Sequence, residues 1–252
     1  MDKKIYEKII AKKEFSHLPK KDVERAFEHF KKRQVSEEEK IRLTRDLLRK
    51  IFSAFLSKKI LSSKNKNVEW ILRKHISTRE RLPYYKKLYK KLLKDFEKPT
   101  IIDLGAGING FSCKFFGKNI NYVGIEGIGQ LTELTNNYFK REKINGKVLH
   151  LSLFDLGKIK KIIKETKKPR IIFLFKALDS LEMLERDYSK KLLSSIMPLV
   201  DRVVISFATR SLIKKTKFKI KRTWFIDFIK DNFKIIDDFE LGAEIYIVLE
   251  SD

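Results

Sequence analysis

The chain has 252 residues, of which 42% are hydrophobic, a fraction that supports a packed core in one large domain or two modest ones. The single cysteine, Cys113, excludes a disulfide framework or a cysteine zinc site, and the four histidines show no metal-ligand spacing, so we expect no metal. The formal net charge of +24 departs from the near-neutral balance of most soluble enzymes and favours a polyanionic partner, because cations that neutralise phosphates release counterions.

The positive charge is concentrated near the amino terminus. Residues 1–98 carry 30 Lys and Arg against 14 Asp and Glu, whereas residues 99–252 carry 27 against 19. A lysine-rich genome would explain part of the total charge but not this asymmetry. No apolar run approaches the ~20 residues of a membrane span, and the amino terminus lacks the apolar core of a signal peptide. We therefore expect a cytoplasmic monomer that does not associate with membranes.

Residues 1 to about 95 contain no glycine, and their apolar residues recur at helical spacing. One helix is predicted around 5–10, and a second, opened by Pro19, around 23–30. Ser36 and Glu39 have the spacing of a capping box that starts a third helix. A polar loop at 62–67 precedes further helix up to about residue 93. The pattern predicts a basic helical RNA-binding domain over residues 1–98.

Three arginines share one face of the third predicted helix, opposite its apolar side. Arg42, Arg45 and Arg49 follow the i, i+3, i+7 spacing that places side chains in a row. Such a row can follow an RNA backbone. The alternative is an ordinary solvated face of the helix.

Apolar strands and helices alternate from Thr100 to the carboxyl terminus, directly after Pro99. This alternation predicts an α/β fold in residues 99–252, a doubly wound parallel sheet of seven strands. Gly242 lies in a turn between the last two strands, so that they form a hairpin and the last strand is antiparallel. The predicted strands are 100–104, 120–126, 148–151, 171–175, 203–207, 234–240 and 244–250, and the predicted helices are about 129–142, 156–166, 180–196 and 223–231.

The first predicted strand ends in the motif D-x-G-x-G, formed by Asp103, Gly105 and Gly107 around Ala106. Glycines suit a turn where a ligand approaches the backbone closely. The motif differs from the dinucleotide fingerprint G-x-G-x-x-G, because no third glycine opens the helix. A second strand ends in Glu126, about 20 residues on, where a carboxylate reaches a ribose. The pattern favours S-adenosylmethionine (SAM) as the ligand; the alternative is an ordinary strand-to-helix turn.

SAM is the methyl donor of methyltransferases, and motifs that are absent from the chain narrow the choice of methyl acceptor. The chain has no Pro-Pro motif of the kind used by exocyclic-amine methylases, and Cys113 lies where a buried small residue is expected rather than a nucleophile. Guanine N7 has a free lone pair, so its methylation needs positioning but no general base, and we assign no catalytic residue. A ribose 2′-hydroxyl is the alternative acceptor, for which Lys176 and Asp179 could form part of a catalytic tetrad.

A basic loop, residues 210–222, follows the fifth predicted strand and carries seven basic residues and no acid. At the mouth of a cofactor site this loop would bind phosphates near the target base, through Arg210, Lys214, Lys215 and Lys217. Trp224 beside it could stack on a flipped base, although packing in the core is the stronger expectation.

Several stretches, taken together and in order, resemble the 16S rRNA guanine-N7 methyltransferases that confer aminoglycoside resistance, the Arm/Rmt group and their relatives in antibiotic-producing actinomycetes. The matching residues span 75–250. They are His75-x-Ser77-Thr78-x-Glu80-Arg81, Asp103-x-Gly105-x-Gly107 with Asn109, Lys176-x-Leu178 with Leu181-Glu182, Ser206-Phe207-Ala208-Thr209-Arg210-Ser211-Leu212, Trp224-Phe225, and Leu241-Gly242-x-Glu244-Ile245-Tyr246. The amino-terminal ~75 residues match only in being helical and basic.

The resemblance implies a Rossmann-like class I SAM-dependent methyltransferase that modifies 16S rRNA in the decoding region of the 30S subunit. It implies that Arg81 holds the SAM carboxylate, Glu126 the ribose, and Asp155 the adenine amino group. Arg210 and the lysines after it would contact the 30S subunit. The full set of implied cofactor-binding residues is His75, Arg81, Asp103, Gly105, Ala106, Gly107, Glu126, Phe154, Asp155 and Lys176.

The chain departs from the family pattern at three positions. Ala208 and Asp179 replace prolines, and Glu126 replaces the usual aspartate. A housekeeping role therefore stands beside drug resistance, and the modified nucleotide stays open. A non-catalytic RNA-binding protein with a degenerate methyltransferase fold is a third alternative, disfavoured because Asp103, Gly105, Gly107 and Glu126 are all present.

Overall fold

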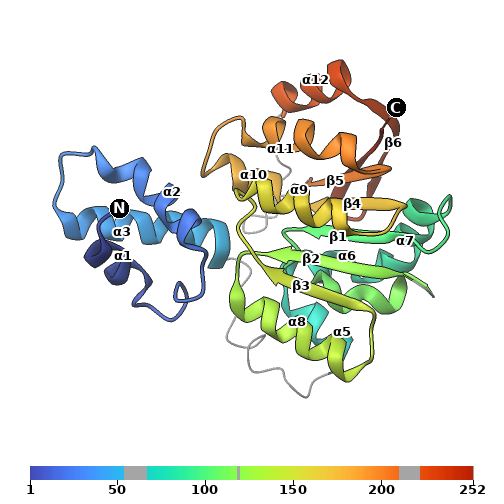
Figure 1. Cartoon of the computed structure of the whole chain (residues 1–252), viewed down its shortest axis with the longest axis horizontal. Coiled ribbons are helices and arrows are strands. Elements are labelled where there is room, and N and C mark those ends of the chain that lie inside the picture. The colour runs from blue at the N-terminus through green and yellow to red at the C-terminus, as the bar shows by residue number, and fades with distance from the viewer. Residues whose placement is uncertain (54–66, 118–119, 210–221, 252) are drawn as a thin grey trace.

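The computed structural model describes residues 1–53, 67–117, 120–209 and 222–251. These residues form two parts, a bundle of three helices at the amino terminus and a larger body built around a sheet (Figure 1). The bundle contains α1 (Lys3–Ile10), α2 (Lys20–Lys31) and α3 (Glu37–Leu48), and a short π-helix, Arg49–Ser53, continues α3. Within the described ranges, no helix is long and apolar enough to cross a membrane.

Local sequence signals set the ends of the bundle helices. The Asp2 side chain accepts a hydrogen bond from the Lys4 N–H and caps α1, and Ser36 accepts one from the Glu39 N–H and caps α3. Helix α2 begins directly after Pro19, as predicted. Apolar side chains from all three helices form the core of the bundle: Ile9, Val23, Phe27, Ile41 and Leu48.

A seven-stranded sheet organises the larger body, with the strand order β3-β2-β1-β4-β5-β7-β6. The first five strands pair in parallel, and β7 is antiparallel to both of its neighbours. The predicted doubly wound sheet with a terminal hairpin is therefore confirmed. The strands are β1 (Thr100–Leu104), β2 (Asn121–Glu126), β3 (Gly146–His150), β4 (Arg170–Phe175), β5 (Arg202–Ala208), β6 (Lys234–Leu241) and β7 (Glu244–Glu250).

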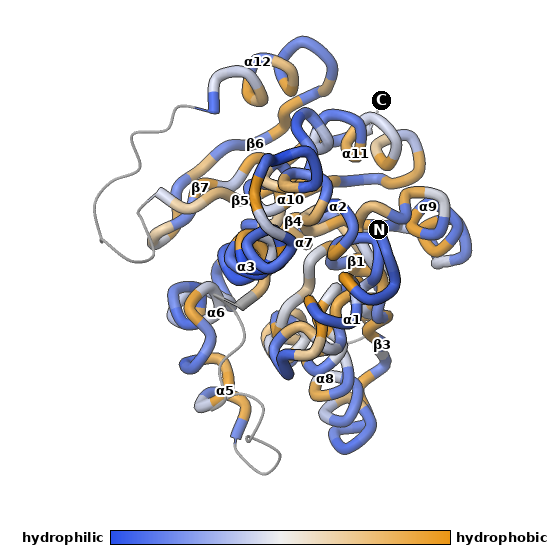
Figure 2. Tube along the Cα trace, turned by 90° about the vertical axis from the view of Figure 1, so that its left-hand side faces the viewer, coloured by the Kyte–Doolittle hydropathy of each residue, from blue (hydrophilic) through white to orange (hydrophobic). Residues whose placement is uncertain are grey.

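Helices cover both faces of the sheet, which is why β1, β4 and β5 are almost continuously buried. On one side of the sheet, α5, α7 and α8 pack around a 3₁₀ helix, Asn109–Phe115. On the opposite side lie α9, α11 and α12 (Figure 1). Most helices combine polar and apolar residues, as amphipathic elements do (Figure 2). The bounds are α5 (Val68–Lys74), α6 (Ile76–Arg81), a 3₁₀ turn (Leu82–Tyr84), α7 (Tyr85–Leu93), α8 (Gly129–Arg141), α9 (Leu156–Glu165), α10 (Leu178–Glu182), α11 (Tyr188–Ile196), a 3₁₀ turn (Met197–Leu199) and α12 (Thr223–Asn232).

The helical first third of the chain does not form one spatial unit. The rings of Tyr85 and Tyr89 in α7 stack on each other. Tyr85 also stacks on Phe115, and Tyr89 stacks on Phe173 of β4 with 6.0 Å between the ring centroids. Residues 68–98 therefore pack with the sheet, and only the part before residue 54 forms the separate bundle. The predicted boundary at residue 98 marks where the sheet begins, whereas the spatial separation falls earlier in the chain.

The single helix predicted around 180–196 is interrupted in the structure. Asp187 adopts the left-handed conformation, with φ of 61°, and separates α10 from α11. The Glu182 carboxylate accepts hydrogen bonds from the N–H groups of Asp187 and Ser189, both at 2.7 Å. A carboxylate is favourable at the start of a helix because the first N–H groups lack partners there.

Candidate functional site

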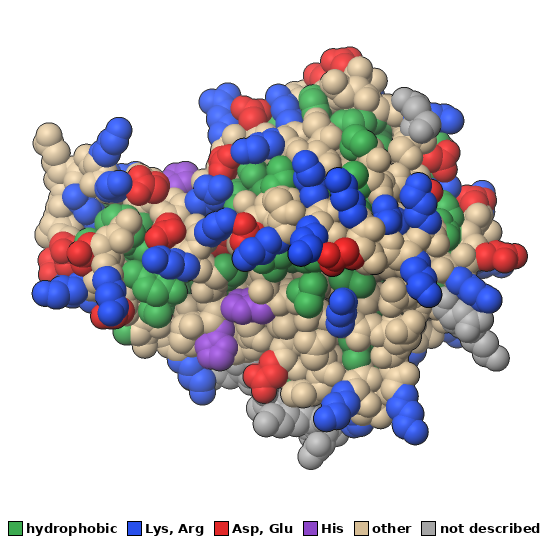
Figure 3. Space-filling view, in the orientation of Figure 1, with side chains coloured by type: hydrophobic (Ala, Val, Ile, Leu, Met, Phe, Trp, Pro, Cys, Tyr) green, Lys and Arg blue, Asp and Glu red, His purple; other side chains and the backbone are tan. Residues whose placement is uncertain are grey.

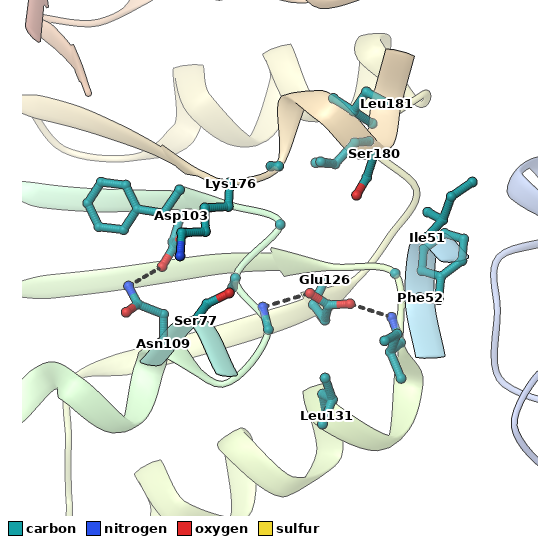
Figure 4. Close-up of a pocket in the computed structure, with 18 of the residues that line it drawn as sticks. Ile51, Phe52, Ser77, Asp103, Asn109, Glu126, Leu131, Lys176, Ser180 and Leu181 are labelled. Carbon is teal, nitrogen blue, oxygen red and sulfur yellow. Dashed lines mark hydrogen bonds between the residues drawn. The ribbon is translucent and has the colours of Figure 1, made fainter. Parts of the chain in front are cut away.

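A cleft opens at the carboxyl ends of β1, β2 and β4, where the strand order reverses (Figure 4). It contains about 870 Å³ of empty space, including the part open to solvent, which is the size of a pocket for a nucleoside-sized ligand. Every predicted cofactor residue except Asp155 lines this cleft. The structure thus brings together residues that lie up to about a hundred positions apart in the sequence.

The glycine turn after β1 has the backbone geometry that the sequence predicts. Gly105 and Gly107 have φ of 79° and 51°, in the left-handed region that favours glycine. A Cβ atom on Gly105 would lie 3.0 Å from the Cβ of Ala177, so any side chain there would crowd the wall of the cleft. The turn is held to β2, because the N–H groups of Gly105 and Ala106 both donate to the Ile125 carbonyl.

Glu126 at the end of β2 is fixed by two backbone hydrogen bonds. Its carboxylate accepts from the N–H of Gly107 and from the N–H of Ile128, each at 2.7 Å (Figure 4). The side chain is 6% exposed, and burial raises its pKa to about 7 despite these two donors. The carboxylate therefore joins the glycine turn to the segment after β2 and presents an acceptor to the cleft.

Asp103 on β1 orders the floor of the cleft. Its Oδ2 atom accepts hydrogen bonds from the Asn109 side chain at 2.8 Å and from the Tyr122 hydroxyl at 2.7 Å. Asn109 in turn accepts from the Tyr85 hydroxyl and from the Arg81 guanidinium, at 2.9 and 3.2 Å. Burial raises the pKa of Asp103 above its ordinary value. The acid is thus a buried anchor that ties the glycine turn to α6 and α7.

Arg81 and Lys176 enter the cleft as members of a buried ion cluster. The Arg81 Nε atom lies 2.8 Å from a carboxylate oxygen of Glu244, and Lys176 contacts Glu244 at 3.1 Å and Glu80 at 2.5 Å. Ser206 also donates a hydrogen bond to Glu244. Burial opposes ionisation of Glu244, but the two cations outweigh it and lower its pKa. This cluster gives one end of the cleft two cations, suited to a carboxylate ligand.

His75 lies beside the glycine turn. A Cβ atom on Gly107 would be 3.6 Å from the imidazole Nε2 atom. Burial, with the nearby charges of Arg81 and Lys176, lowers the pKa of His75 to about 3, so the ring is neutral at physiological pH.

Three cleft residues, Asp22, Ile51 and Phe52, come from the amino-terminal bundle, where the sequence indicated no cofactor site. Asp22 of α2 is buried and accepts a hydrogen bond from the Ser152 hydroxyl, which follows β3. Phe52, from the short π-helix after α3, faces Glu126 across the cleft (Figure 4). The spacing of Asp22 and Ala26 places the acid on the buried side of its helix. An acid on an apolar face is the one feature of the sequence that could have indicated Asp22 as a site residue. Glu244 lies in one of the stretches that resemble the methyltransferase family, but the sequence suggested no role for it.

Not every predicted residue lines the cleft, and four of them lie outside the described residues. Asp155 does not line the cleft: at the start of α9 it pairs with Lys21 and Lys158. The predicted core position of Trp224 is wrong, since the residue is 41% exposed. The predicted RNA contacts Arg210, Lys214, Lys215 and Lys217 lie outside the described residues.

The predicted arginine row on α3 is engaged within the bundle. Arg42 binds the carboxylates of Glu39 and Asp46. Arg45 donates to the Lys8 and Ile9 carbonyls at the end of α1, and Arg49 binds Glu14 and Asp46. Arg45 and Arg49 thus join α3 to α1 and the following loop, whereas the partners of Arg42 lie in α3 itself. RNA contact by these arginines stays a prediction.

The sheet topology, the glycine turn and the acid after β2 together define the class I fold of SAM-dependent methyltransferases. The model of the ribosomal RNA methyltransferase family FmrO matches residues 30–232. The chain belongs to this family, which confirms the class of enzyme that the motifs indicated.

Solved structures agree with this assignment at the level of the fold. The 16S rRNA methylase RmtF, in complex with S-adenosyl-L-homocysteine, superimposes with a TM-score of 0.81 at 19% identity, over 100% of both chains. An rRNA methylase from Escherichia coli gives 0.80 at 19% identity over 99% of both chains. The 16S rRNA methylase RmtB gives 0.79 at 18% identity, over 99% of this chain and 98% of its own. No curated protein matches the chain by sequence.

Proposed function

We propose that the chain binds SAM in the cleft and transfers its methyl group to guanine N7 of 16S rRNA in the decoding region of the 30S subunit. The observation that carries this proposal is the meeting of glycine turn, Glu126 and the Arg81–Lys176 cations in one cleft of an rRNA methyltransferase fold. The complex of RmtF with S-adenosyl-L-homocysteine and the 16S rRNA named for RmtB and RmtF support the ligand and the substrate.

The cleft can hold SAM by both of its ends. Glu126 would accept hydrogen bonds from the ribose hydroxyls, and the cations Arg81 and Lys176 would face the carboxylate of the methionine part. The close backbone at Gly105 and Gly107 leaves room for the chain between these ends. Bound SAM supplies an electrophilic methyl group on a sulfonium.

The chemistry requires positioning rather than acid–base catalysis. The guanine N7 lone pair attacks the methyl carbon in line, the carbon–sulfur bond breaks, and its electron pair stays on sulfur. No proton is removed, so the absence of an assigned general base suits this acceptor. The exposed Trp224 at the start of α12 is available for stacking on the target base.

The ribose 2′-hydroxyl is a weaker candidate as the acceptor. Deprotonating it requires a lysine held for proton transfer, and Lys176 with Asp179 was the sequence hint. In the structure Asp179 binds Arg222 at 2.6 and 2.8 Å, whereas Lys176 binds Glu80 and Glu244. The two residues of the expected tetrad therefore have other partners.

The test is methyl transfer from labelled SAM to purified 30S subunits, followed by borohydride and aniline cleavage and primer extension. A strand break at a guanine of the decoding helix is the expected result. Labelled RNA without cleavage would move the acceptor to another atom, the ribose hydroxyl first. No labelled RNA together with no SAM binding would favour a non-catalytic RNA-binding protein. Aminoglycoside sensitivity of cells expressing the chain then separates a resistance role from a housekeeping role.

A further inference from the structure

The amino-terminal bundle is docked on the edge of the sheet that contains the cleft. The Gly129 N–H, after β2, donates to the His17 carbonyl at 3.1 Å. Arg25 of α2 pairs with Glu185 at 3.2 Å, and His29 lies within hydrogen-bond distance of the Leu184 carbonyl, at 2.9 Å. These contacts reach the segments after β2 and β4, so α2 forms one wall of the cleft.

Asp22 is the acid that α2 places in this wall. It is 3% exposed, and its Oδ1 atom accepts from the Ser152 hydroxyl, which itself accepts from the Phe154 N–H at 3.0 Å. The Oδ2 atom lies 3.4 Å from the position of a Cβ on Gly127, the residue directly after Glu126. Among the described residues, Ser152 is the one hydrogen-bond donor recorded for this carboxylate. Oδ2 is thus available to a donor from a ligand.

A buried carboxylate is costly unless donors satisfy both oxygens. Burial raises the pKa of Asp22 to about 6, against the opposing effect of its Ser152 hydrogen bond. At physiological pH the carboxylate is largely ionised and has one donor. A ligand with an N–H group at this point would supply the second.

The surroundings of Asp22 match a purine. With the ribose on Glu126, the base would lie among apolar side chains that line the cleft, which include Ile128, Leu131, Leu153, Phe154 and Leu181. Adenine carries one exocyclic amino group, which needs a hydrogen-bond acceptor. The acid after β3 that the resemblance suggested, Asp155, is turned to Lys21 and Lys158 and does not line the cleft.

We propose that Asp22, contributed by the amino-terminal bundle and held by Ser152, accepts the hydrogen bond from the adenine amino group of the cofactor. This inference rests on the proposed SAM binding. It makes the bundle part of the cofactor site, because the acceptor comes from α2 and not from the methyltransferase sheet.

The test compares two ligands that differ only at this group, S-adenosyl-L-homocysteine and its 6-oxo analogue S-inosyl-L-homocysteine. Titration calorimetry on the full chain gives the ratio of their dissociation constants. We expect the wild type to prefer the 6-amino ligand by about ten- to a hundredfold, the range for a hydrogen bond to a charged group. In Asp22→Asn the ratio should fall to within about threefold, because the amide can donate to a 6-oxo group.

Asp155→Asn is the matched control, since it makes the same change in a nearby acid that does not line the cleft and pairs with Lys21 and Lys158. Its ligand ratio should equal that of the wild type. The proposal would be overturned if the preference for the 6-amino ligand were lost in Asp155→Asn but kept in Asp22→Asn. It would also be overturned if Asp22→Asn lowered the affinity for both ligands by the same factor. Thermal unfolding of each variant without ligand shows whether it is folded. If the wild type binds neither ligand, the proposed function itself fails, which is distinguishable from an unchanged ratio.

Discussion

At the scale of single residues, Glu126 is the side chain whose ionisation should control cofactor binding. Its pKa is raised to about 7 by burial, against the N–H groups of Ile128 and Gly107, and the nearby acids Asp103 and Asp22 raise it further. The ionised form accepts hydrogen bonds from the ribose more strongly. As pH falls through 7, Glu126 takes up a proton and the affinity should decrease. We expect S-adenosyl-L-homocysteine affinity to rise about tenfold from pH 6 to pH 8, measured by calorimetry.

Glu126→Gln isolates this effect, because glutamine keeps the shape and an acceptor oxygen but does not titrate. The variant retains any pH dependence from the ligand's own amino group and from Asp22. We expect its affinity to change by less than about threefold over the same range. An equally steep pH dependence in wild type and variant would assign the titration to another group.

Glu244 should be the most important single carboxylate for the stability of the site. It is 1% exposed and pairs with both Arg81 and Lys176, whose side chains are 4% and 7% exposed, whereas Glu80 pairs with Lys176 alone. Removing the charge in Glu244→Gln leaves two buried cations with less compensation, which costs about 3–5 kcal/mol for a broken buried pair. Urea unfolding measures this loss.

Glu165→Gln is the comparison variant, because it makes the same change in an exposed pair with Lys161. Exposed pairs are worth about 0–1 kcal/mol, so its free energy of unfolding should be nearly unchanged. Similar small losses in both variants would show that the buried cluster is not needed for stability.

The site residues that could be predicted are those that belong to a recognisable local sequence pattern. Gly105, Gly107 and Glu126 were recognisable because a short strand precedes each signal and the spacing between them is fixed by the fold. Asp22 and Glu244 reach the cleft from helix α2 and strand β7, and no local pattern says which distant segment they will meet. The sequence does not separate a cofactor contact by Asp155 from a place at the start of the following helix, where the structure pairs this acid with Lys21 and Lys158.

At the scale of elements, the turn between β6 and β7 connects the hairpin to the site. Gly242 has φ of 66°, and a Cβ on it would lie 2.6 Å from the Tyr84 ring. Gly242→Ala should destabilise the fold by about 2–4 kcal/mol, because it combines an unfavourable φ with overpacking. Cofactor affinity should fall as well, since Glu244 follows the turn directly. Chemical denaturation and calorimetry check the two effects.

Gly157→Ala is a suitable control for this prediction. Gly157 lies in α9, and nothing is within 4 Å of a Cβ placed on it. Alanine should be neutral there or stabilise by up to about 1 kcal/mol, because it is the better helix former. A stable Gly242→Ala variant would mean that the Tyr84 ring moves aside without cost.

Most elements were predictable because their apolar periodicity is strong and their boundaries coincide with glycine, proline or capping residues. The break between α10 and α11 was not, since apolar residues continue through it at helical spacing. It depends on one residue in the left-handed conformation and on the Glu182 carboxylate, which caps the next helix. The position of α7 was also hidden, because its amphipathic pattern does not say whether the bundle or the sheet covers its apolar side.

At the scale of the whole molecule, the cofactor should be bound by buried, paired cations and the RNA by exposed ones. The cations that face the cofactor are buried and paired, as Arg81 and Lys176 are with Glu244. Many other Lys and Arg side chains lie on the surface of both the bundle and the sheet body (Figure 3). Salt screens exposed charges strongly and buried pairs weakly.

This difference gives a prediction about ionic strength. The affinity for 30S subunits should fall by about 10³–10⁵ between 50 and 200 mM monovalent salt at fixed magnesium, the range for 6–10 phosphate contacts. Over the same range the affinity for S-adenosyl-L-homocysteine should change by less than about threefold, because its partners in the cleft are shielded from the added ions. Filter binding with labelled subunits and calorimetry give the two slopes. A flat salt dependence for the subunits would mean that the net charge of +24 is not used in binding RNA, and a steep one for the cofactor would mean that the cleft is open to the solvent ions.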